Sequence, residues 1–207
     1  MDVTELRAVL ERTLDAMPVH ADELRTLDAA IGDGDLGITV SAGAKAAREA
    51  VSALDESADI RTVLLALAKA FSTANPSTFA ALVGGGLLAA AKTTGVKAEL
   101  ARADAVELGD AVATRIAERG KVQLGDKTIL DVLIPSLETL RTHTGSNTDA
   151  LDAMIATAQS QVDATTGLQS KKGRAAWVHE RSVGHPDPGA TAYLRFLQEL
   201  RATWVRP

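Results

Sequence analysis

The sequence predicts an all-α protein, an antiparallel barrel or bundle of about eight helices. Alanine and leucine dominate the composition and aromatic residues make up only 3% of it, and alanine is the strongest helix former. Apolar residues recur with helical spacing along almost the whole chain, whereas runs rich in Val, Ile, Thr and Tyr, which mark strands, are missing. Small side chains let helices pack closely, which favours a bundle.

Apolar stripes locate the expected helices in chain order. The first stripe covers residues 6–17, a second helix runs from Ala21 to about Asp28, and a third begins near Leu36. Later stripes cover residues 60–67, 108–116, 130–137, 151–155 and 193–200. The expected breaks are Gly32 to Gly37, Asn75-Pro76, Gly84 to Gly86, Gly95, Gly120, Gly125, Gly145, Gly173 and Pro186 to Gly189. We expect a single domain over residues 1–207.

Composition excludes several classes of function. The net charge of −5 argues against a nucleic-acid or anionic-membrane partner. The chain has no cysteine, which excludes disulfides, zinc thiolates and thiol catalysis. It has no apolar run of about 20 residues and no basic-then-apolar N-terminal pattern. We therefore expect a cytoplasmic protein without a membrane partner.

Three carboxylates, Asp28, Asp33 and Asp35, lie within eight residues beside a glycine-rich stretch. Two like charges about 5 Å apart repel by roughly 3 kcal/mol at an effective dielectric of about 20, so a cation between them would hold them together. Oxygen ligands suit Mg²⁺ or Ca²⁺ rather than zinc or copper, and the spacing is not that of an EF-hand. The alternative interpretation is that Asp33 or Asp35 only caps the helix that begins near Leu36.

A second motif, Gly125-Asp126-Lys127-Thr128, precedes the stripe at residues 130–137. Asp126 is suited to cap a helix with Lys127 and Thr128 in its first turn, which would make the motif an ordinary helix start. The functional interpretation is a second helix terminus that faces a phosphate or nucleotide.

The segment over residues 173–191 combines charge, proline and glycine. Arg174 is suited to pair with phosphate through its planar donors. Arg181 is suited to pair with a buried carboxylate such as Glu180 or Asp187, which would be a structural role. His185 is suited either to a hydrogen-bonded structural role or to that of a base.

Hydroxyl groups follow the break at Asn75-Pro76, in Ser77 and Thr78. They are suited to donate to phosphate oxygens, or to act as plain helix caps. The triplet over residues 84–86 allows close helix packing. No Gly-x4-Gly-Lys-Ser/Thr pattern occurs in the chain, so a phosphate site here is not a Walker loop.

Together these motifs resemble the L-subunit, or DAK2-domain, family of dihydroxyacetone kinases over roughly residues 21 to 200. The matching residues are Asp28, Gly32-Asp33-Gly34-Asp35, Gly37, Gly125-Asp126-Lys127-Thr128, Asp131, Pro135, Gly173-Arg174-Ala175, Glu180-Arg181-Ser182, Gly184-His185, and Asp187-Pro188-Gly189-Ala190-Thr191. The order and the spacing of the whole set carry the resemblance.

The resemblance implies an antiparallel barrel of eight helices that binds ADP or ATP with two Mg²⁺ ions. It implies that Asp28, Asp33 and Asp35 hold the ions against the nucleotide phosphates. The implied nucleotide contacts are Leu36, Gly37, Ile38, Thr39, Ser77, Thr78, Gly120, Ile129, Arg174, Asp187, Pro188 and Gly189. In this family the terminal phosphoryl group passes to dihydroxyacetone held covalently by a histidine of a separate K subunit or domain, so no catalytic residue is expected on this chain alone.

The implied partners are a K-type dihydroxyacetone-binding subunit, a phosphocarrier fed by phosphoenolpyruvate, and a second copy of the chain in a homodimer. One alternative is a subunit of an ATP-dependent kinase for another short ketose or polyol. Another is a non-catalytic nucleotide-binding partner of a transcription regulator, and a third is a helical domain with a lone structural cation.

The chain departs from the family pattern at three places. Leu36 stands where the family commonly has histidine against the nucleotide. The run over residues 75–79 stands where the family has Gly-Gly-Ser/Thr-Ser-Gly, and Ile129 where it often has methionine. The first two departures concern the phosphate cradle and indicate a divergent branch.

Overall fold

The structure is a computed structural model that describes residues 1–204. Within these residues the chain forms nine α-helices, two 3₁₀ helices and no strand, which confirms the predicted all-α class. The elements are α1 (Val3–Ala16), η1 (Met17–His20), α2 (Ala21–Ile31), α3 (Leu36–Ser52), α4 (Ile60–Ala74), α5 (Thr78–Thr93), α6 (Arg102–Gly120), α7 (Leu130–Thr142), α8 (Asn147–Thr166), η2 (Arg174–Ser182) and α9 (Pro188–Thr203).

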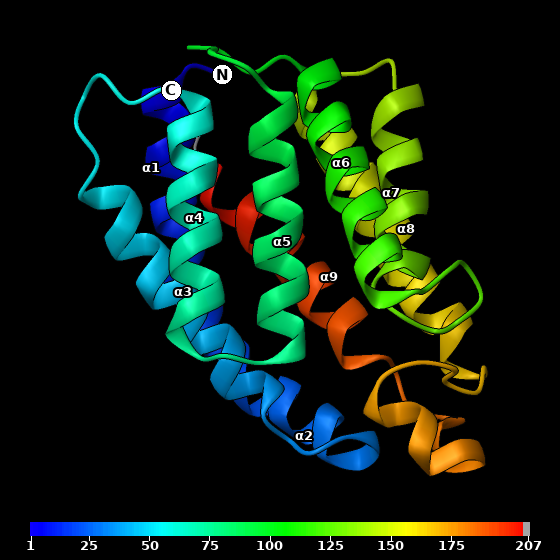
Figure 1. Ribbon diagram of the computed structural model, residues 1–207. Helices are drawn as coiled ribbons and strands as arrows, with labels where there is room; N and C mark the ends of the chain where they lie inside the picture. Colours follow the sequence, from blue (N-terminus) through cyan, green and yellow to red (C-terminus); the bar gives the residue numbers. More distant parts are fainter. Residues whose placement is uncertain (205–207) are drawn as a thin grey trace.

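Eight of these helices form a closed ring in which neighbours run in opposite directions. The order around the ring is α1, α3, α4, α5, α6, α7, α8 and α9, and α9 contacts α1 to close it (Figure 1). Most successive helices of the ring are joined by short connections, which favour antiparallel neighbours, whereas α8 and α9 are joined by the longer segment 167–187. Helix α2 lies at one end of the ring, beside α3, α9 and η2. Because directions alternate, α3, α5, α7 and α9 all begin at this α2 end.

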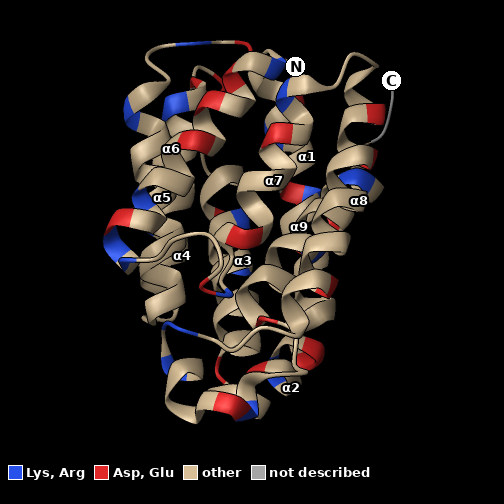
Figure 2. Ribbon diagram, turned by 90° about the vertical axis from the view of Figure 1, so that its right-hand side faces the viewer, with Lys and Arg blue, Asp and Glu red and all other residues tan. Residues whose placement is uncertain are grey.

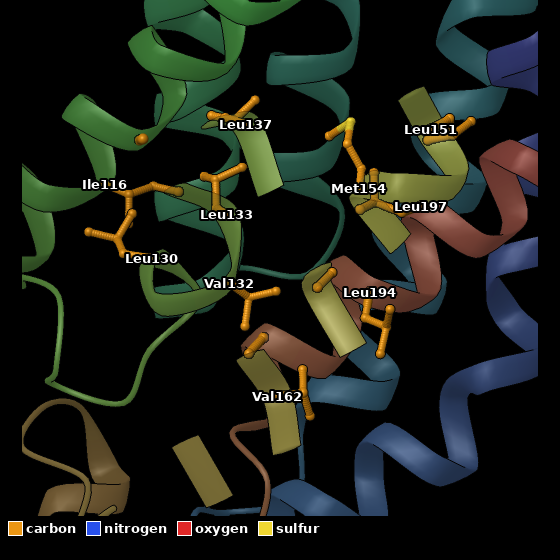
Figure 3. Close-up of a cluster of buried hydrophobic side chains, with 13 residues drawn as sticks. Ile116, Leu130, Val132, Leu133, Leu137, Leu151, Met154, Val162, Leu194 and Leu197 are labelled. Carbon is orange, nitrogen blue, oxygen red and sulfur yellow. The ribbon is translucent and has the colours of Figure 1, made fainter. Parts of the chain in front are cut away.

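Two clusters of buried apolar side chains fill the ring. One cluster draws on α6 to α9 and includes Leu133, Met154 and Leu194 (Figure 3). The other draws mainly on α1 to α4 and includes Val40 and Val63. Phe196 of α9 packs against both clusters, so α9 joins the two halves of the barrel. None of the helices among residues 1–204 combines the length and apolar character that crossing a bilayer requires.

The break predicted at Gly84 to Gly86 is wrong, because α5 continues through all three glycines. Their role is close packing. A Cβ at Gly84 would lie 2.9 Å from the carbonyl oxygen of Ala68 in α4, and one at Gly86 would lie 2.9 Å from Val112 in α6. Glycine costs a helix only about 1 kcal/mol relative to alanine, and the close approach to both neighbours outweighs it. A Cβ at Gly85 would find its nearest atom, in Arg115, at 3.8 Å.

Asp187 caps α9 and stabilises its first turn. The Asp187 carboxylate accepts a hydrogen bond of 2.8 Å from the backbone N–H of Ala190. Burial nevertheless raises the pKa of Asp187 to about 6, although that bond and the charge of Lys127 act in the opposite direction. The ionised form is therefore less favourable in the folded protein than in the unfolded chain.

The glycine triplet gives a matched pair of substitutions. Gly84→Ala should lower the free energy of unfolding by about 1–3 kcal/mol, because the added methyl group meets the backbone of α4. Gly85→Ala, in the same helix, should leave stability unchanged or raise it by up to about 1 kcal/mol. Urea denaturation followed by circular dichroism measures both. Equal losses in the two variants would show that packing against α4 is not the cause.

The raised pKa of Asp187 predicts a pH effect on stability. A carboxyl that binds its proton more tightly in the folded state gains stability as the pH falls through its folded-state pKa. Asn is an equally good helix cap but does not titrate. Between pH 7 and pH 5 the unfolding free energy of the wild type should therefore rise by about 1 kcal/mol relative to Asp187→Asn. Parallel profiles in urea denaturation would contradict this assignment.

Candidate functional site

The three predicted metal-ligating carboxylates lie together at the α2 end of the barrel. Asp28 lies in the last turns of α2, slightly before the end of the helix at Ile31, rather than at its last residue as predicted. Asp33 and Asp35 lie in the four-residue connection to α3. One oxygen from each carboxylate lies within 4.8 Å of the other two. An oxygen-only donor set of this size and charge fits Mg²⁺.

Glycine allows the connection to turn back on α2. Gly34 has a φ of +77°, in the left-handed region that residues with a Cβ rarely adopt. A Cβ at Gly32 would clash with the side chain of Asp28, and one at Gly37 would clash with the carbonyl oxygen of Ala21. The close approach of α3 to the start of α2 therefore depends on glycine at position 37.

Arg174 of η2 brings a positive charge to the acidic cluster. Its guanidinium donates a hydrogen bond to Asp33, and Nη1 lies 3.7 Å from Oδ2 of Asp35. Figure 2 shows acidic and basic positions close together at the α2 end. Burial, and then the charges of Asp33 and Asp28, raise the pKa of Asp35, while Arg174 lowers it. The pair joins segments that are 141 residues apart.

The interpretation of Asp33 or Asp35 as a helix cap finds no support in the geometry. Asp35 occupies the N-cap position of α3, but its side chain makes no capping hydrogen bond. The backbone N–H of Leu36 donates instead to Oδ2 of Asp28, at 3.2 Å. The side chain of Leu36 is buried in the core, so only its backbone faces the cluster. The substitution of the family's histidine thus removes a polar side chain and keeps a backbone donor.

The starts of α3 and α5 share a network of hydroxyl groups. The buried Thr39 donates to the Ser77 hydroxyl at 3.4 Å and accepts from Asn75 at 3.2 Å. Ser77 also caps α5, because its hydroxyl accepts from the backbone N–H of Ala80. The cap interpretation therefore holds for Ser77, whereas Thr78 is exposed at the first position of the helix.

The start of α9 lies beside the start of α5. A Cβ on Gly189 would lie 3.4 Å from the ring of Phe79. Phe79 in turn packs edge-on against Phe71 of α4, with ring centroids 6.4 Å apart. Phe79, another departure from the family pattern, thus fills space between three helices. Pro188 occupies the first turn of α9 and is buried.

The structure corrects the prediction for the Gly125–Thr128 motif. Helix α7 begins at Leu130, so Asp126 does not cap it and Lys127 is not in its first turn. The Asp126 carboxylate accepts from the backbone N–H of Gln123 at 3.0 Å and stabilises the loop itself. Thr128 donates its backbone N–H to Asp131 at 2.7 Å, which fixes the loop to the helix that follows. Because the Asp126 side chain bonds to the backbone of its own loop, this turn competes with the helix, and α7 begins only at Leu130.

The remaining predicted residues also lie at the α2 end. Gly120 ends α6, and Ile129 immediately precedes α7. Ile38 is exposed in the first turn of α3. Arg181 makes no ion pair with any residue in the described range, so neither Glu180 nor Asp187 is its partner. The side chain of His185 is exposed.

Two residues at this end were not singled out by their own chemistry in the sequence. Asn75 donates to Thr39, and its only signal in the sequence was its position before Pro76. Lys127 is almost fully buried, and its motif placed it at a helix start rather than in the interior. The contacts of Asn75 and Lys127 join segments that are far apart in the sequence, which a local pattern does not reveal.

Comparison with known proteins places the chain among kinase subunits. Residues 30–202 match the family described as DAK2 domain. The chain is 31% identical to "PEP-dependent dihydroxyacetone kinase, ADP-binding subunit DhaL" of Escherichia coli (strain K12), and the match covers 95% of each protein. It is 32% identical to "L-erythrulose 1-kinase" of Mycolicibacterium smegmatis, over 93% of this chain but 34% of that protein.

A solved structure has the same fold. The crystal structure of the dihydroxyacetone kinase from C. freundii in complex with AMP-PNP and Mg²⁺ matches with a TM-score of 0.74 at 20% identity. The match covers 95% of this chain and 33% of that one. The family match spans most of the barrel, and the E. coli relative is covered almost from end to end. The chain therefore belongs to the DAK2 domain family.

Proposed function

We propose that this chain is the ADP- or ATP-binding subunit of a dihydroxyacetone-type kinase. It would present a magnesium-bound nucleotide to dihydroxyacetone held on a separate K-type subunit. The observation that carries the proposal is the convergence of Asp28, Asp33 and Asp35 within 4.8 Å, at the end of the barrel where four helices begin. The family match and the name of the E. coli relative support the same function.

The acidic cluster would hold two Mg²⁺ ions. The three carboxylates supply only hard oxygen ligands, which is the donor set that magnesium prefers. Magnesium bound there would neutralise charge that develops on the phosphates during transfer. The C. freundii kinase structure contains Mg²⁺ and AMP-PNP, which supports this assignment.

The residues of the chain itself would bind and orient the phosphates. The first turn of α3 directly follows the cluster, and the start of α5 is bonded to that turn through Ser77 and Thr39. Free backbone N–H groups at helix starts attract anions. Arg174 would bind phosphate oxygens through its planar donors. Phosphoryl transfer depends mainly on positioning and charge neutralisation, so this arrangement needs no nucleophile on the chain. The remaining predicted contacts are Leu36, Gly37, Ile38, Thr39, Ser77, Thr78, Gly120, Ile129, Asp187, Pro188 and Gly189.

Partner subunits would dock at the α2 end. Trp177 of η2 is 76% exposed and Ile38 of α3 is 60% exposed, so both apolar side chains are available to a partner at this end. A K-type subunit would bring its substrate to this face. A phosphocarrier fed by phosphoenolpyruvate would recharge the bound ADP, in keeping with the name of the E. coli relative. Homodimer formation stays a prediction.

A second function has support in the names of three relatives, which are erythrulose kinases. One of them, from M. smegmatis, is named for L-erythrulose, and this chain spans about a third of it. A subunit of an ATP-dependent kinase for such a short ketose would use the same nucleotide site. The two functions differ in the acceptor and in the source of the phosphoryl group.

The acidic cluster predicts opposite effects on binding and stability. Asp35→Asn should weaken ADP binding in the presence of Mg²⁺ at least tenfold, or about 1.4 kcal/mol. Since burial and like charges raise the pKa of Asp35, the same change should leave the melting temperature of the nucleotide-free protein unchanged or higher. Isothermal titration calorimetry and thermal denaturation measure the two effects.

Asp22→Asn is the matched control for this test. Asp22 lies on the same helix as Asp28, and its side chain is almost fully exposed near Arg25. This variant should bind ADP like the wild type. Wild-type affinity in Asp35→Asn, with Mg²⁺ present, would remove the cluster from the nucleotide site.

Nucleotide handling separates the two candidate functions. A subunit recharged by a phosphocarrier should keep ADP through dialysis and accept a phosphoryl group from phosphoenolpyruvate through the carrier proteins. A subunit of an ATP-dependent kinase should instead exchange ADP freely for ATP. Native mass spectrometry before and after dialysis, followed by transfer assays with a K-type subunit and either dihydroxyacetone or erythrulose, measures the difference. Absence of nucleotide binding under all conditions would contradict both functions.

A further inference from the structure

Lys127 is a buried lysine that makes three hydrogen bonds to backbone carbonyl groups. It is 1% exposed, and its φ of +60° is uncommon for a residue with a Cβ. Its Nζ donates to the carbonyl oxygens of Thr166 at 3.1 Å, Leu168 at 2.8 Å and Ser182 at 2.7 Å. An ammonium group has three donors, so all of them are used. Burial lowers the pKa of Lys127, and the nearby charge of Asp187 opposes this.

The three carbonyl groups lie at the two ends of one loop. Residues 167–184, which we name the Arg174 loop, leave the end of α8 at Thr166 and return toward α9. Lys127 contacts the chain where the loop departs and again where it returns at Ser182. The backbone N–H of Gly184 also donates to Thr166, at 2.9 Å. These bonds close the base of the Arg174 loop around a single ammonium group.

Further bonds join the Arg174 loop to the loop that carries Lys127. The backbone N–H of Lys171 donates to the carbonyl oxygen of Asp126 at 3.1 Å. Ser170 donates its backbone N–H to the hydroxyl of Ser182 at 2.9 Å, so the outgoing and returning segments of the Arg174 loop are also bonded to each other. Arg174, which lies within the loop, then contacts Asp33 in the acidic cluster.

Burying an ammonium group is costly, and Lys127 makes no ion pair within hydrogen-bonding distance among the described residues. An apolar side chain of similar length would fill the same space without that cost, but it would remove the hydrogen bonds to all three carbonyl groups. The lysine gives three converging directional bonds that fix two ends of one loop. A loop whose arginine must bind a ligand at a defined position needs its two ends to be fixed in this way.

We propose that Lys127 is a positioning residue for nucleotide binding, which acts by fixing the Arg174 loop so that Arg174 faces the acidic cluster. This inference rests on the proposed function, because it assigns Arg174 to the nucleotide phosphates. Lys127 does not itself touch the nucleotide. Its effect on affinity passes through Arg174, and the two residues therefore act as one unit.

A double-mutant cycle tests this coupling. Lys127→Met and Arg174→Gln should each weaken binding of ADP with Mg²⁺ at least tenfold in isothermal titration calorimetry. The double variant should bind no more than about twofold more weakly than Arg174→Gln alone, because a loop without its arginine gains nothing from being fixed. If the loss of ADP affinity in the double variant equals the product of the two single-variant losses, the proposal is wrong.

Lys121→Met is the matched control. Lys121 lies in the same inter-helix loop, has a φ of +51° and is exposed. This variant should bind ADP within twofold of the wild type. A loss equal to that of Lys127→Met would show that any lysine of this loop affects binding, and it would overturn the specific role of Lys127.

Hydrogen exchange gives a readout that does not depend on nucleotide. In the ligand-free protein, amides of residues 168–183 should exchange faster in Lys127→Met than in the wild type, while those of α4 and α5 should not change. Unchanged exchange in the Arg174 loop would overturn the proposal. If Lys127→Met does not fold, Ser182→Ala removes the acceptor for Ser170 and should loosen the same loop.

The two levels of inference fail in different ways. If the wild type binds no ADP with Mg²⁺, the proposed function is wrong, and the role of Lys127 in nucleotide binding falls with it. If the wild type binds ADP and the two substitutions act independently, the proposed function stands and only the positioning role is wrong.

Discussion

The alternation of helix direction around a closed ring is the constraint on which this structure depends. In such a ring every second helix begins at the same end, so the starts of α3, α5, α7 and α9 share one rim. Their free N–H groups and dipoles make that rim favourable for negative charge. The acidic turn before α3 places carboxylates on this rim, and a cation between the aspartates and an anionic ligand would offset their mutual repulsion. The ring thus brings helix starts, which attract negative charge, to the same rim as three aspartates that repel one another. Arg174 offsets part of this repulsion.

Local features of the site could be predicted from the sequence, and long-range ones could not. Asp28, Asp33 and Asp35 are close in the chain, and glycine makes their turn possible, so the cluster was visible as a pattern. Helical spacing predicted a helical bundle or barrel, and the family resemblance implied the antiparallel barrel. The three bonds of Lys127 reach across 39 to 55 residues, and no pattern near the motif indicates them.

The errors in the sequence-based predictions have a common physical cause. Gly84 to Gly86 read as a break because glycine is a poor helix former, but contacts with α4 and α6 outweigh that preference. Asp126 read as a helix cap because aspartate favours that position, but it bonds within its own loop instead. In each case local preference was weaker than the packing or hydrogen bonding of the surrounding structure.

The separation between partners at the site also bears on the order in which it forms during synthesis. The bond between Asp28 and Leu36 spans eight residues, whereas the pair of Arg174 with Asp33 spans 141. Nearby contacts close early, and distant ones wait for more of the chain. On the ribosome the aspartates therefore emerge well over a hundred residues before the arginine that contacts Asp33 and Asp35. Until then, this turn of the nascent barrel lacks the positive charge that Arg174 supplies in the folded protein.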